Sequence, residues 1–344
     1  MEWAFNINKD SYTPLFKQIS EQILAWIREG KLQPGDHLPS MNQLAIMLGM
    51  SRETAKKTYN LLVREKAVIA QRGKGVFIAG KDGSAIKDIL VIFDKQSIYN
   101  QILLQSMQEM LKGMARFTIL LHGQNPDVLE YCLDSSLDRY DYYVVSPHFP
   151  MDASSQGKAA KLLSRIPNRK LIMVDNWLRQ VQGNYGVVYQ DFRNDACSAL
   201  TEVKDEIVGS RGRLRIIVLP QSLYGSFILE SVRDFAKLSG IRISVYKSVP
   251  EDWEKGDVVI VINSQLDSGL VELARHINSC KLVPGKDVRI ISYNEFPLNE
   301  LVLGGLTVIS TDFRQMGRTA AGMIITGTPS KIHNPFSMIR RNTF

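Results

Sequence analysis

The chain has 344 residues, 44% of them hydrophobic and 22% charged, and a formal net charge of +7. These values are ordinary for a globular protein and leave room for two or three domains with sizeable cores. Its three cysteines are far apart and its five histidines are scattered, which argues against a disulfide framework and against zinc or any other metal. The N-terminus has no basic segment followed by an apolar run, and no apolar stretch approaches the ~20 residues that span a bilayer, so we expect a cytoplasmic protein without a membrane partner.

Residues 13–30 predict an amphipathic first helix. Thr13 is expected to cap this helix and Pro14 to occupy its first position. Gly30 ends the pattern. The apolar face of the helix repeats at helical spacing and consists of Leu15, Ile19, Ile23, Leu24 and Ile27.

Two shorter helices and a hairpin follow the first helix. Ser40 is expected to cap the second helix, which ends at Gly49, and Ser51 is expected to cap the third. Residues 68–71 and 76–78 predict two strands around a basic, glycine-containing turn. This layout is typical of a winged helix-turn-helix, in which the last helix enters the major groove of DNA. The inner face of that helix is expected to contain Tyr59, Leu61, Leu62 and Val63.

Positive charge is concentrated in this part of the chain. Residues 51–77 hold seven Lys and Arg against two Glu, a local balance of +5. A compact basic patch attracts the phosphates of DNA. Charged helix faces are often no more than solvated, and it is the hairpin that favours the DNA-binding interpretation.

Residues 12–79 resemble the GntR family of bacterial transcriptional regulators. The matching positions are Pro14–Ile19, Gly30–Ser40, Leu44-Ala45, Ser51-Arg52 and Gly73–Gly75. The resemblance implies DNA contacts from Ser40, from the start of the third helix and from the wing. The family usually has an acidic and then a basic residue after Pro-Ser, whereas this chain has Met41 and Asn42, an amide that can still hydrogen-bond a base or phosphate. The candidate DNA-binding residues, with the cap of the third helix and the basic turn included, are Ser40, Asn42, Ser51, Arg52, Thr54, Lys56, Arg72, Lys74 and Gly75.

The segment 80–84 has the composition of a linker, and the pattern changes after it. We therefore expect a DNA-binding domain at 1–79, a linker at 80–87 and a second domain at 88–344. Apolar strands and amphipathic helices alternate in this second part, which predicts an α/β fold with parallel sheets covered on both faces. Its length fits two doubly wound lobes with a ligand between the carboxyl ends of their strands. The expected strands are 89–93, 118–121, 142–145, 171–174, 214–219, 241–246, 258–262 and 288–292, and the expected helices are 98–114, 126–137, 157–165, 222–238 and 268–279.

Polar and aromatic residues stand where several of these apolar strands stop. Such residues can hydrogen-bond a polyhydroxylated ligand and stack on its apolar face. Asp and Asn after strands are also common turn formers, so any single position is ambiguous. The candidate ligand-binding residues are Phe93, Tyr99, Ser146, Asp175, Trp177, Asp191, Asn263 and Asn294.

Residues 87–344 resemble the sensor domain of the LacI/GalR regulators, which is similar to periplasmic sugar-binding proteins. The matching stretches are Val187–Asp191, Pro284–Asn294, Leu306–Ile309, Met316–Ala321 and Ile339–Thr343. The resemblance implies ligand contacts from Asp191, Asn263 and Asn294, and more loosely from Asp175, Ser146 and Phe93. Many members place an arginine near the start of the helix after Pro220. This chain has Ser226–Leu229 there and Arg233 one turn later, which leaves the identity of the ligand open.

These features together predict a winged helix-turn-helix joined to a two-lobed, periplasmic-binding-protein-like domain. The expected function is a homodimeric repressor that binds an operator on double-stranded DNA and responds to a small metabolite, a sugar or sugar derivative, without a cofactor. A constitutive DNA-binding dimer with a degenerate sensor stays open as an alternative, as does a fused enzyme domain, although no glycine-rich phosphate loop, GxSxG motif or paired catalytic His/Cys set is present. The sequence does not give the effector, the operator, the sign of regulation or a choice between dimer and tetramer.

Overall fold

The computed structural model describes residues 3–9, 11–71, 74–80, 86–210, 212–218, 223–262 and 268–344. The chain forms two compact units. One comprises Met1–Leu90 with Leu111–Thr118 and Asp138–Tyr142, and the other comprises the rest of the chain. None of the described helices combines the length and apolar character that crossing a bilayer requires.

The N-terminal part is the expected winged helix. Its two reciprocal capping bonds run from the backbone N–H of Gln43 to Oγ of Ser40, at 3.2 Å, and from the N–H of Ser40 to Oε1 of Gln43, at 2.8 Å. Gly49 ends the capped helix with φ +57°. The three strands pair in the order β1-β3-β2. The elements are α1 (Leu15–Arg28), β1 (His37–Leu38), α2 (Met41–Leu48), α3 (Arg52–Arg64), β2 (Val68–Gln71) and β3 (Gly75–Ile78).

Two expectations for this part are wrong. Pro14, with extended backbone, takes the N-cap place of α1 instead of Thr13, whose carbonyl accepts a hydrogen bond from Nε2 of Gln18 at 2.6 Å. Val63 is 44% exposed, because the buried face of α3 repeats at i, i+3, i+4 and i+7 and ends at Leu62. The two-residue strand β1 was not expected, since two residues show no period.

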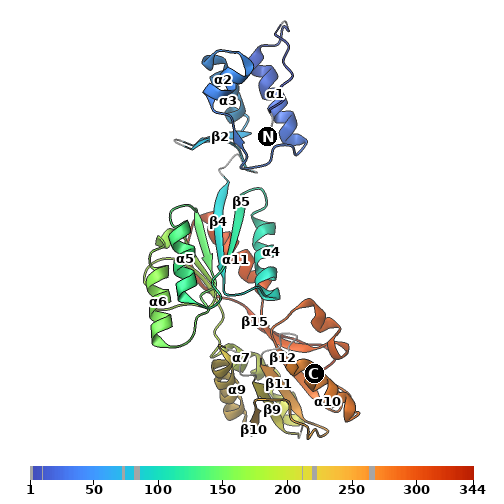
Figure 1. The fold of residues 1–344 in the computed structure, drawn as a ribbon. Helices are drawn as coiled ribbons and strands as arrows, with labels where there is room; N and C mark the ends of the chain where they lie inside the picture. Colours follow the sequence, from blue (N-terminus) through green and yellow to red (C-terminus); the bar gives the residue numbers. More distant parts are fainter. Residues whose placement is uncertain are drawn as a thin grey trace. The chain divides into compact units, whose positions relative to one another are not determined.

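The second part of the chain contains two six-stranded sheets, one in each lobe (Figure 1). We call N-lobe the sheet β14-β8-β7-β6-β4-β5 with its helices, and C-lobe the sheet β10-β9-β11-β12-β13-β15 with its helices. The strands are β4 (Lys87–Phe93), β5 (Ala115–Leu121), β6 (Tyr142–Val145), β7 (Leu171–Asp175), β8 (Gly186–Tyr189), β9 (Leu214–Val218), β10 (Ile243–Tyr246), β11 (Val258–Ile262), β12 (Arg289–Tyr293), β13 (Thr307–Thr311), β14 (Lys331–His333) and β15 (Phe336–Ile339). The helices are α4 (Ile98–Met110), α5 (Pro126–Ser136), α6 (Ala153–Leu163), α7 (Asp195–Thr201), α8 (Lys204–Gly209), α9 (Gly225–Ser239), α10 (Ser268–Ser279) and α11 (Phe313–Thr326), and the 3-10 turns are η1 (Asn168–Lys170), η2 (Pro297–Glu300) and η3 (Val302–Gly304).

Helices cover both faces of each sheet, as a doubly wound fold requires. In the C-lobe, α7 and α9 pack on one face and α10 packs on the other. In the N-lobe, α5 and α6 pack together, as do α4 and α11, and Figure 1 shows α5 and α6 on the opposite side of the strands from α4. The apolar strands are therefore buried on both faces, which confirms the expected α/β fold.

The chain crosses between the lobes three times, after β8, β13 and β14. Backbone hydrogen bonds join the crossing segments: the N–H of Asn334 donates to the carbonyl of Tyr189 at 2.8 Å, and the N–H of Asp312 to the carbonyl of Pro335 at 3.0 Å. Nδ2 of Asn334 also donates to Oγ1 of Thr311, at 2.7 Å. The crossing segments are thus bonded to one another where the chain passes between the lobes, and we call them the hinge.

Several expected boundaries move by a few residues. The helix expected at 98–114 ends at Met110, since the chain turns at Gly113 with φ +75° and starts β5 at Ala115. The helix expected from residue 157 starts earlier, at Ala153, where Asp152 caps it by accepting from the N–H of Ser155 at 2.9 Å. Strands 142–145 and 258–262 and helix 268–279 have the expected bounds.

Candidate functional site

The third helix presents basic side chains on its outer face. Arg52 and Lys56 are exposed, whereas Ala55 and Tyr59 are buried against the rest of the winged helix. Burial raises the pKa of the Tyr59 phenol, which stays neutral and donates to the carbonyl of Pro39 just before α2. The outer face is thereby held at a fixed angle to α2.

Capping bonds order the start of α3. Oγ of Ser51 accepts from the N–H of Thr54 at 3.1 Å and lies 2.8 Å from Oγ1 of Thr54. The two hydroxyls therefore fix the first turn of the helix, where Arg52 stands. Of the sequence candidates in α2, Ser40 is used as the cap and Asn42 is exposed in the first turn.

The wing depends on a glycine. Gly75 has φ +115°, and a Cβ there would collide with Nε2 of His37. That nitrogen lies 3.2 Å from the carbonyl of Lys74, whose side chain is exposed. Arg72, a further candidate, lies outside the described residues.

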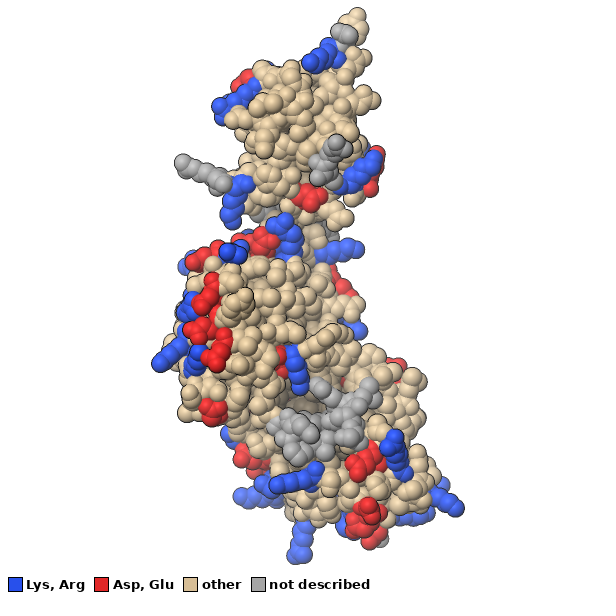
Figure 2. All heavy atoms as spheres, in the orientation of Figure 1, with Lys and Arg blue, Asp and Glu red and all other residues tan. Residues whose placement is uncertain are grey.

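The net positive charge of the protein is not gathered in one patch on the face drawn in Figure 2. On the face drawn in Figure 2, Lys and Arg side chains are interspersed with Asp and Glu. The case for DNA contact therefore rests on the geometry of α3 and the wing, not on the net charge of +7.

A buried hydrogen-bonded chain links the two lobes. His148, in the segment after β6 of the N-lobe, places Nε2 2.8 Å from Oδ2 of Asp175, at the end of β7. Its Nδ1 lies 2.9 Å from the hydroxyl of Tyr224, which precedes α9 of the C-lobe. Asp175 also accepts a hydrogen bond from Nε2 of Gln190 in the first crossing segment. The candidate Asp175 is thus at the centre of the contact between the lobes.

The charge state of this chain follows from its surroundings. Burial lowers the pKa of His148, but the charge and hydrogen bond of Asp175, together with the charge of Asp94, outweigh burial and leave the pKa raised. Burial, followed by the charges of Asp175 and Asp94, raises the pKa of Tyr224 well above 10. A protonated His148 donates from both ring nitrogens, so Tyr224 then serves as the acceptor across the lobes.

The second buried histidine is neutral. Nδ1 of His122 accepts from the N–H of Gln124 at 3.1 Å, so Nε2 carries the proton and donates to the carbonyl of Ser146 at 2.9 Å. Burial lowers the pKa of His122, in keeping with this tautomer. The candidate Ser146 is fully buried, and its Oγ has no partner among the described residues.

Other N-lobe candidates are engaged within the protein. The side chain of Phe93 is 3% exposed at the end of β4. The ring of Tyr99 on α4 stacks on that of Phe313, the first residue of α11, with centroids 5.0 Å apart. Phe93 is therefore buried and Tyr99 has a stacking partner, and neither residue lines the pocket described next.

One pocket, which we call the aromatic pocket, brings sequence candidates from both sides of the hinge together. It has a volume of about 440 Å³. Gln190 is 5% exposed, and its Oε1 has no partner among the described residues. Asp191 accepts from Nδ2 of Asn194 at 2.7 Å and from the N–H of Arg193 at 3.2 Å. The lining includes Trp177, Arg179, Tyr189, Gln190, Asp191, Arg193, Tyr224 and Phe227.

Rings form much of the wall of the aromatic pocket. Tyr224 stacks on Phe192 with centroids 4.1 Å apart and ring planes 4° apart. The rings of Trp177 and Tyr189 lie 5.1 Å apart. Such walls suit the apolar face of a ring-shaped ligand, while the buried amide of Gln190 offers an acceptor for its hydroxyls.

Two C-lobe candidates have different outcomes. Asn294 follows β12 with φ +74°, and its buried Oδ1 has no partner within the described part of the chain. Asn263 lies outside the described residues. The role of both in ligand binding stays a prediction.

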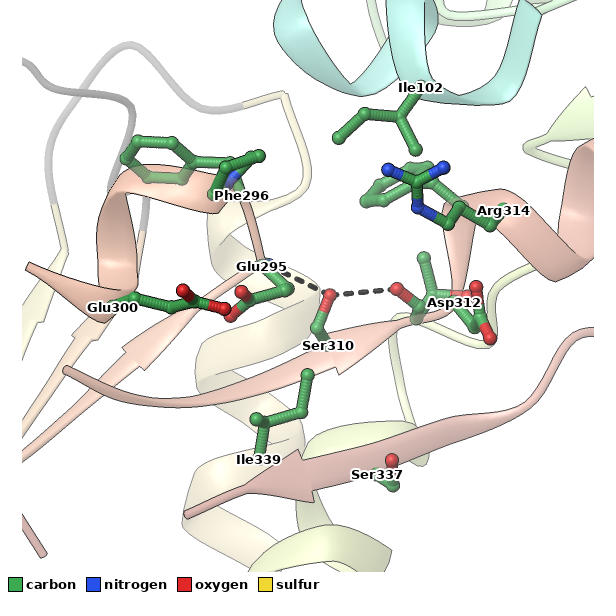
Figure 3. Close-up of a pocket in the computed structure, with 12 residues that line it drawn as sticks. Ile102, Glu295, Phe296, Glu300, Ser310, Asp312, Arg314, Ser337 and Ile339 are labelled. Atoms are coloured by element: carbon green, nitrogen blue, oxygen red, sulfur yellow. Dashed lines mark hydrogen bonds between the residues drawn. The ribbon is translucent and has the colours of Figure 1, made fainter. Parts of the chain in front are cut away.

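A second pocket, of about 480 Å³, lies beside the second crossing, between β13 and α11 (Figure 3). Glu300 and Arg314 stand on opposite sides of it, and Ile102 of α4 contributes an apolar side chain. Ser310 accepts from the N–H of Glu295 at 2.9 Å and donates to the carbonyl of Thr311 at 2.8 Å. The carboxylate of Glu295 forms an ion pair with Arg341 at 2.7 Å and is thereby neutralised.

Sequence reasoning missed the partners of the candidates it found. His148, Gln190 and Arg179 lie within four residues after the end of a strand, and Tyr224 lies just before a helix, but no motif marked them as candidates. In the described ranges, no group of three or more His, Cys, Asp or Glu side chains is arranged to hold a metal ion.

The N-terminal part matches known regulators in sequence. The profile described as "Bacterial regulatory proteins, gntR family" matches residues 15–78. The HTH-type transcriptional repressor NagR of Bacillus subtilis is 39% identical over 74 residues, which are 22% of this chain and 30% of NagR. The uncharacterized HTH-type transcriptional regulator YhcF of the same organism is 34% identical over 112 residues, 31% of this chain and 93% of YhcF. The chain therefore spans almost all of YhcF but less than a third of NagR.

The larger part matches a known fold. The crystal structure of a LacI family transcriptional regulator from Lactobacillus casei with bound sucrose aligns with a TM-score of 0.56 at 12% identity. The alignment covers 75% of this chain and 99% of that one. At this identity the similarity establishes the fold.

Proposed function

This chain belongs to the gntR family of bacterial regulatory proteins, and from that premise we propose that it is a DNA-binding transcriptional repressor controlled by a small metabolite. The observation that carries the proposal is the presence in one chain of an exposed basic helix, α3, and an incompletely satisfied polar pocket between two lobes. The first feature suits an operator and the second suits an effector. No catalytic role is part of the proposal.

The roles follow the domain boundaries expected from the sequence. Residues 1–79 bind DNA through α3 in the major groove and Lys74 at the wing, residues 80–87 link the domains, and residues 88–344 bind the effector. The effector is a sugar or sugar derivative; the similarly folded Lactobacillus casei regulator, which holds sucrose, supports this class. Effector binding and operator binding then change each other's free energy by the same amount.

We also propose a homodimer, so that two winged helices read a pseudo-palindromic operator. Strand β5 lies at the edge of its sheet and exposes Ile119 and Leu121, each 46% exposed, and Tyr131 on the next helix is 75% exposed. An apolar edge of this kind is suited to burial against a second copy. Sedimentation of the purified protein should give twice the chain mass, and a monomer on operator DNA would contradict this assignment.

One observation favours the alternative of a constitutive DNA binder. The protein's own hydrogen bond between His148 and Tyr224 joins the lobes. In that case the second domain would serve dimerisation alone, and no small molecule would alter operator affinity.

Operator selection followed by effector screening tests the proposal. The operator is selected from random duplex DNA with the full-length protein, and its affinity is measured at fixed salt, because such affinities depend steeply on salt. A sugar panel is then screened for thermal stabilisation and for operator release. A ligand at about 100 times its dissociation constant should add roughly 2.7 kcal/mol. Asp191→Asn and Asn294→Ala should weaken the response to that sugar and keep operator affinity, whereas selection of no DNA sequence would refute the proposal.

A further inference from the structure

The aromatic pocket contains a guanidinium without an acidic partner. Arg179, in the loop after β7, is exposed and lies over the ring of Trp177 at 4.2 Å and that of Tyr189 at 5.8 Å. Within the described part of the chain it forms no ion pair with a carboxylate. Stacking fixes the plane of the group and leaves its N–H donors available.

The other arginine of this pocket is in a different state. Nη1 of Arg193 lies 2.7 Å from Oε2 of Glu230, and its guanidinium lies 4.1 Å from the ring centroid of Phe227. Its charge is therefore already neutralised. Arg179 and Arg193 thus line the same pocket, and each lies over an aromatic ring. They differ in that only Arg193 forms an ion pair with a carboxylate.

Lysine adds to the positive potential around Arg179. Nζ of Lys331 lies 5.3 Å from the ring centroid of Trp177 and donates to the carbonyl of Gly183 at 3.3 Å. The acid in the lining is Asp191, whose carboxylate already accepts two hydrogen bonds. At Trp177 the pocket therefore offers the guanidinium of Arg179, which no carboxylate of the described residues neutralises, and Lys331, although not part of the lining, lies near the same ring.

At Gln190 the same pocket favours a hydrogen-bond donor of the ligand, whereas at Arg179 it favours an anion. Oε1 of Gln190 is buried and unpartnered, so it requires a donor such as a hydroxyl. The rings of Tyr224 and Phe227 line the wall beside it. A ligand that satisfies both ends has hydroxyls at one end and an anionic group at the other.

We propose that the effector is a sugar that carries an anionic group, a phosphate or a carboxylate, and that Arg179 binds this group. The proposal rests on the function proposed above and narrows its ligand class. It also accounts for the absence of an arginine at the start of α9, where this chain has Ser226–Leu229, because the cation comes from the N-lobe instead.

The second pocket fits such a ligand less well. Besides Glu295, which is paired with Arg341, its lining holds the carboxylates of Glu300 and Asp312 against the one cation of Arg314. Negative charge of this kind repels an anion. The aromatic pocket, where Arg179 has no acidic partner among the described residues and the one aspartate already accepts two hydrogen bonds, is the better site for an anionic sugar.

The test compares matched sugars and matched arginine variants. Glucose, glucose 6-phosphate and glucuronate, and the same series for galactose and mannose, are titrated into the full-length protein at constant ionic strength, with inorganic phosphate as the control for charge alone. Binding is followed by calorimetry and by operator release. An anionic member should bind about ten- to a hundredfold more tightly than its neutral parent, the effect of a charge-assisted hydrogen bond. The phosphate and uronate arms identify which anion is recognised.

Arg179→Gln should remove this preference, whereas Arg193→Gln should keep it because the Arg193 guanidinium is already paired with Glu230. Arg179→Lys retains the positive charge but not the planar guanidinium with its paired N–H donors, so it should retain part of the preference for the anionic sugar. An intact unfolding transition in each variant shows that the pocket still folds.

Equal affinity for neutral and anionic members would overturn the proposal and leave a neutral-sugar regulator. A preference that survives Arg179→Gln, or stabilisation by inorganic phosphate that is the same in the wild type and in Arg179→Gln, would also overturn it. Failure of every sugar to bind or to release the operator would refute the sugar effector of the proposed function as well.

Discussion

The outer face of α3 and the contact between the lobes hold their polar side chains in opposite ways. On α3, Arg52 and Lys56 are exposed and make no ion pair within the described part of the chain. Between the lobes, His148, Asp175 and Gln190 are bonded to one another and largely removed from water. The first surface can be changed one residue at a time, whereas a change in the second is passed to its neighbours.

The exposed charges of α3 and the buried pairs between the lobes contribute to different free energies, that of binding and that of folding. Exposed charges contribute little to the stability of the fold and become valuable when they meet phosphate or bases. Buried, paired charges are costly to separate, so they oppose any movement that pulls the lobes apart. Substitutions should therefore affect binding alone in the first region, and stability together with response in the second.

The largest effect is expected from Asp175→Asn. The side chains of Asp175 and His148 are 15% and 7% exposed, and removing one partner of such a pair costs about 3–5 kcal/mol. Asn also accepts the φ of +72° at this position better than most residues. Urea unfolding should show the loss with operator affinity unchanged. A loss below about 1 kcal/mol would mean that the pair is effectively solvated.

The same pair should make stability depend on pH. Because the pKa of His148 is raised above 6.5, its contribution is complete below that pH and is lost as pH rises through the raised value. Asp175, Asp94 and Tyr224 face the ring, and Lys95 opposes the shift. Asp175→Asn should flatten the alkaline side of the profile of unfolding free energy against pH. An identical slope in both proteins would assign the dependence to other groups.

The next effect concerns α3. Arg52→Ala should weaken operator binding by roughly 1–3 kcal/mol if Arg52 contacts a base, with no change in the free energy of unfolding. Arg64→Ala at the far end of the same helix is the control and should have a smaller effect. Fluorescence anisotropy with labelled operator measures both. Equal losses would place the recognition surface elsewhere on the helix.

A smaller effect is expected from the cap of α2. Ser40→Ala removes the acceptor for the N–H of Gln43 and should cost about 1 kcal/mol of stability in the winged helix. Gln43→Ala removes the reciprocal hydrogen bond to the N–H of Ser40 and measures how much that bond contributes to the free energy of unfolding. Thermal unfolding of the winged-helix transition would report both, and the response to effector should not change. An unaltered transition would show that the neighbouring helices suffice to hold α2.

The smallest effect is expected from Tyr224→Phe. This change removes the hydrogen bond to His148 and keeps the stacked ring on Phe192, so it should cost roughly 0.5–1.5 kcal/mol. The lobes should then separate more readily. Small-angle scattering without effector would detect the separation, and a curve equal to that of the wild type would assign lobe closure to the hinge segments.

Local rules predicted most of the winged helix. Ser40, Gly49 and Ser51 act within one turn of the residues they cap, so the sequence carries their signal directly. The wrong prediction for the start of α1 is also a local one: the N-cap residue is Pro14, one position after the predicted Thr13.

The site between the lobes could be predicted only in part. Asp175, Trp177 and Asp191 were candidates because the ends of parallel strands converge at one edge of a sheet, and of these Trp177 and Asp191 line the aromatic pocket; their role in ligand binding stays a prediction. The hydrogen bond between His148 and Tyr224 joins residues 76 positions apart, and no period in the sequence encodes it. Nothing in the sequence indicated the role proposed for Arg179 either. Whether an arginine has an acidic partner depends on which carboxylates the fold brings near it, and these can be distant in the sequence. Arg72 and Asn263, outside the described residues, stay predictions.

The three crossings between the lobes have a consequence for synthesis on the ribosome. The winged helix is complete once residue 78 has emerged, but the N-lobe needs α11 against α4 and β14 against β8, and therefore residue 333. At about 5–20 residues per second, this interval lasts roughly 10–50 s. A nascent chain thus has a folded winged helix well before the lobe that would regulate it. Any truncation ahead of α11 removes that lobe and spares the winged helix.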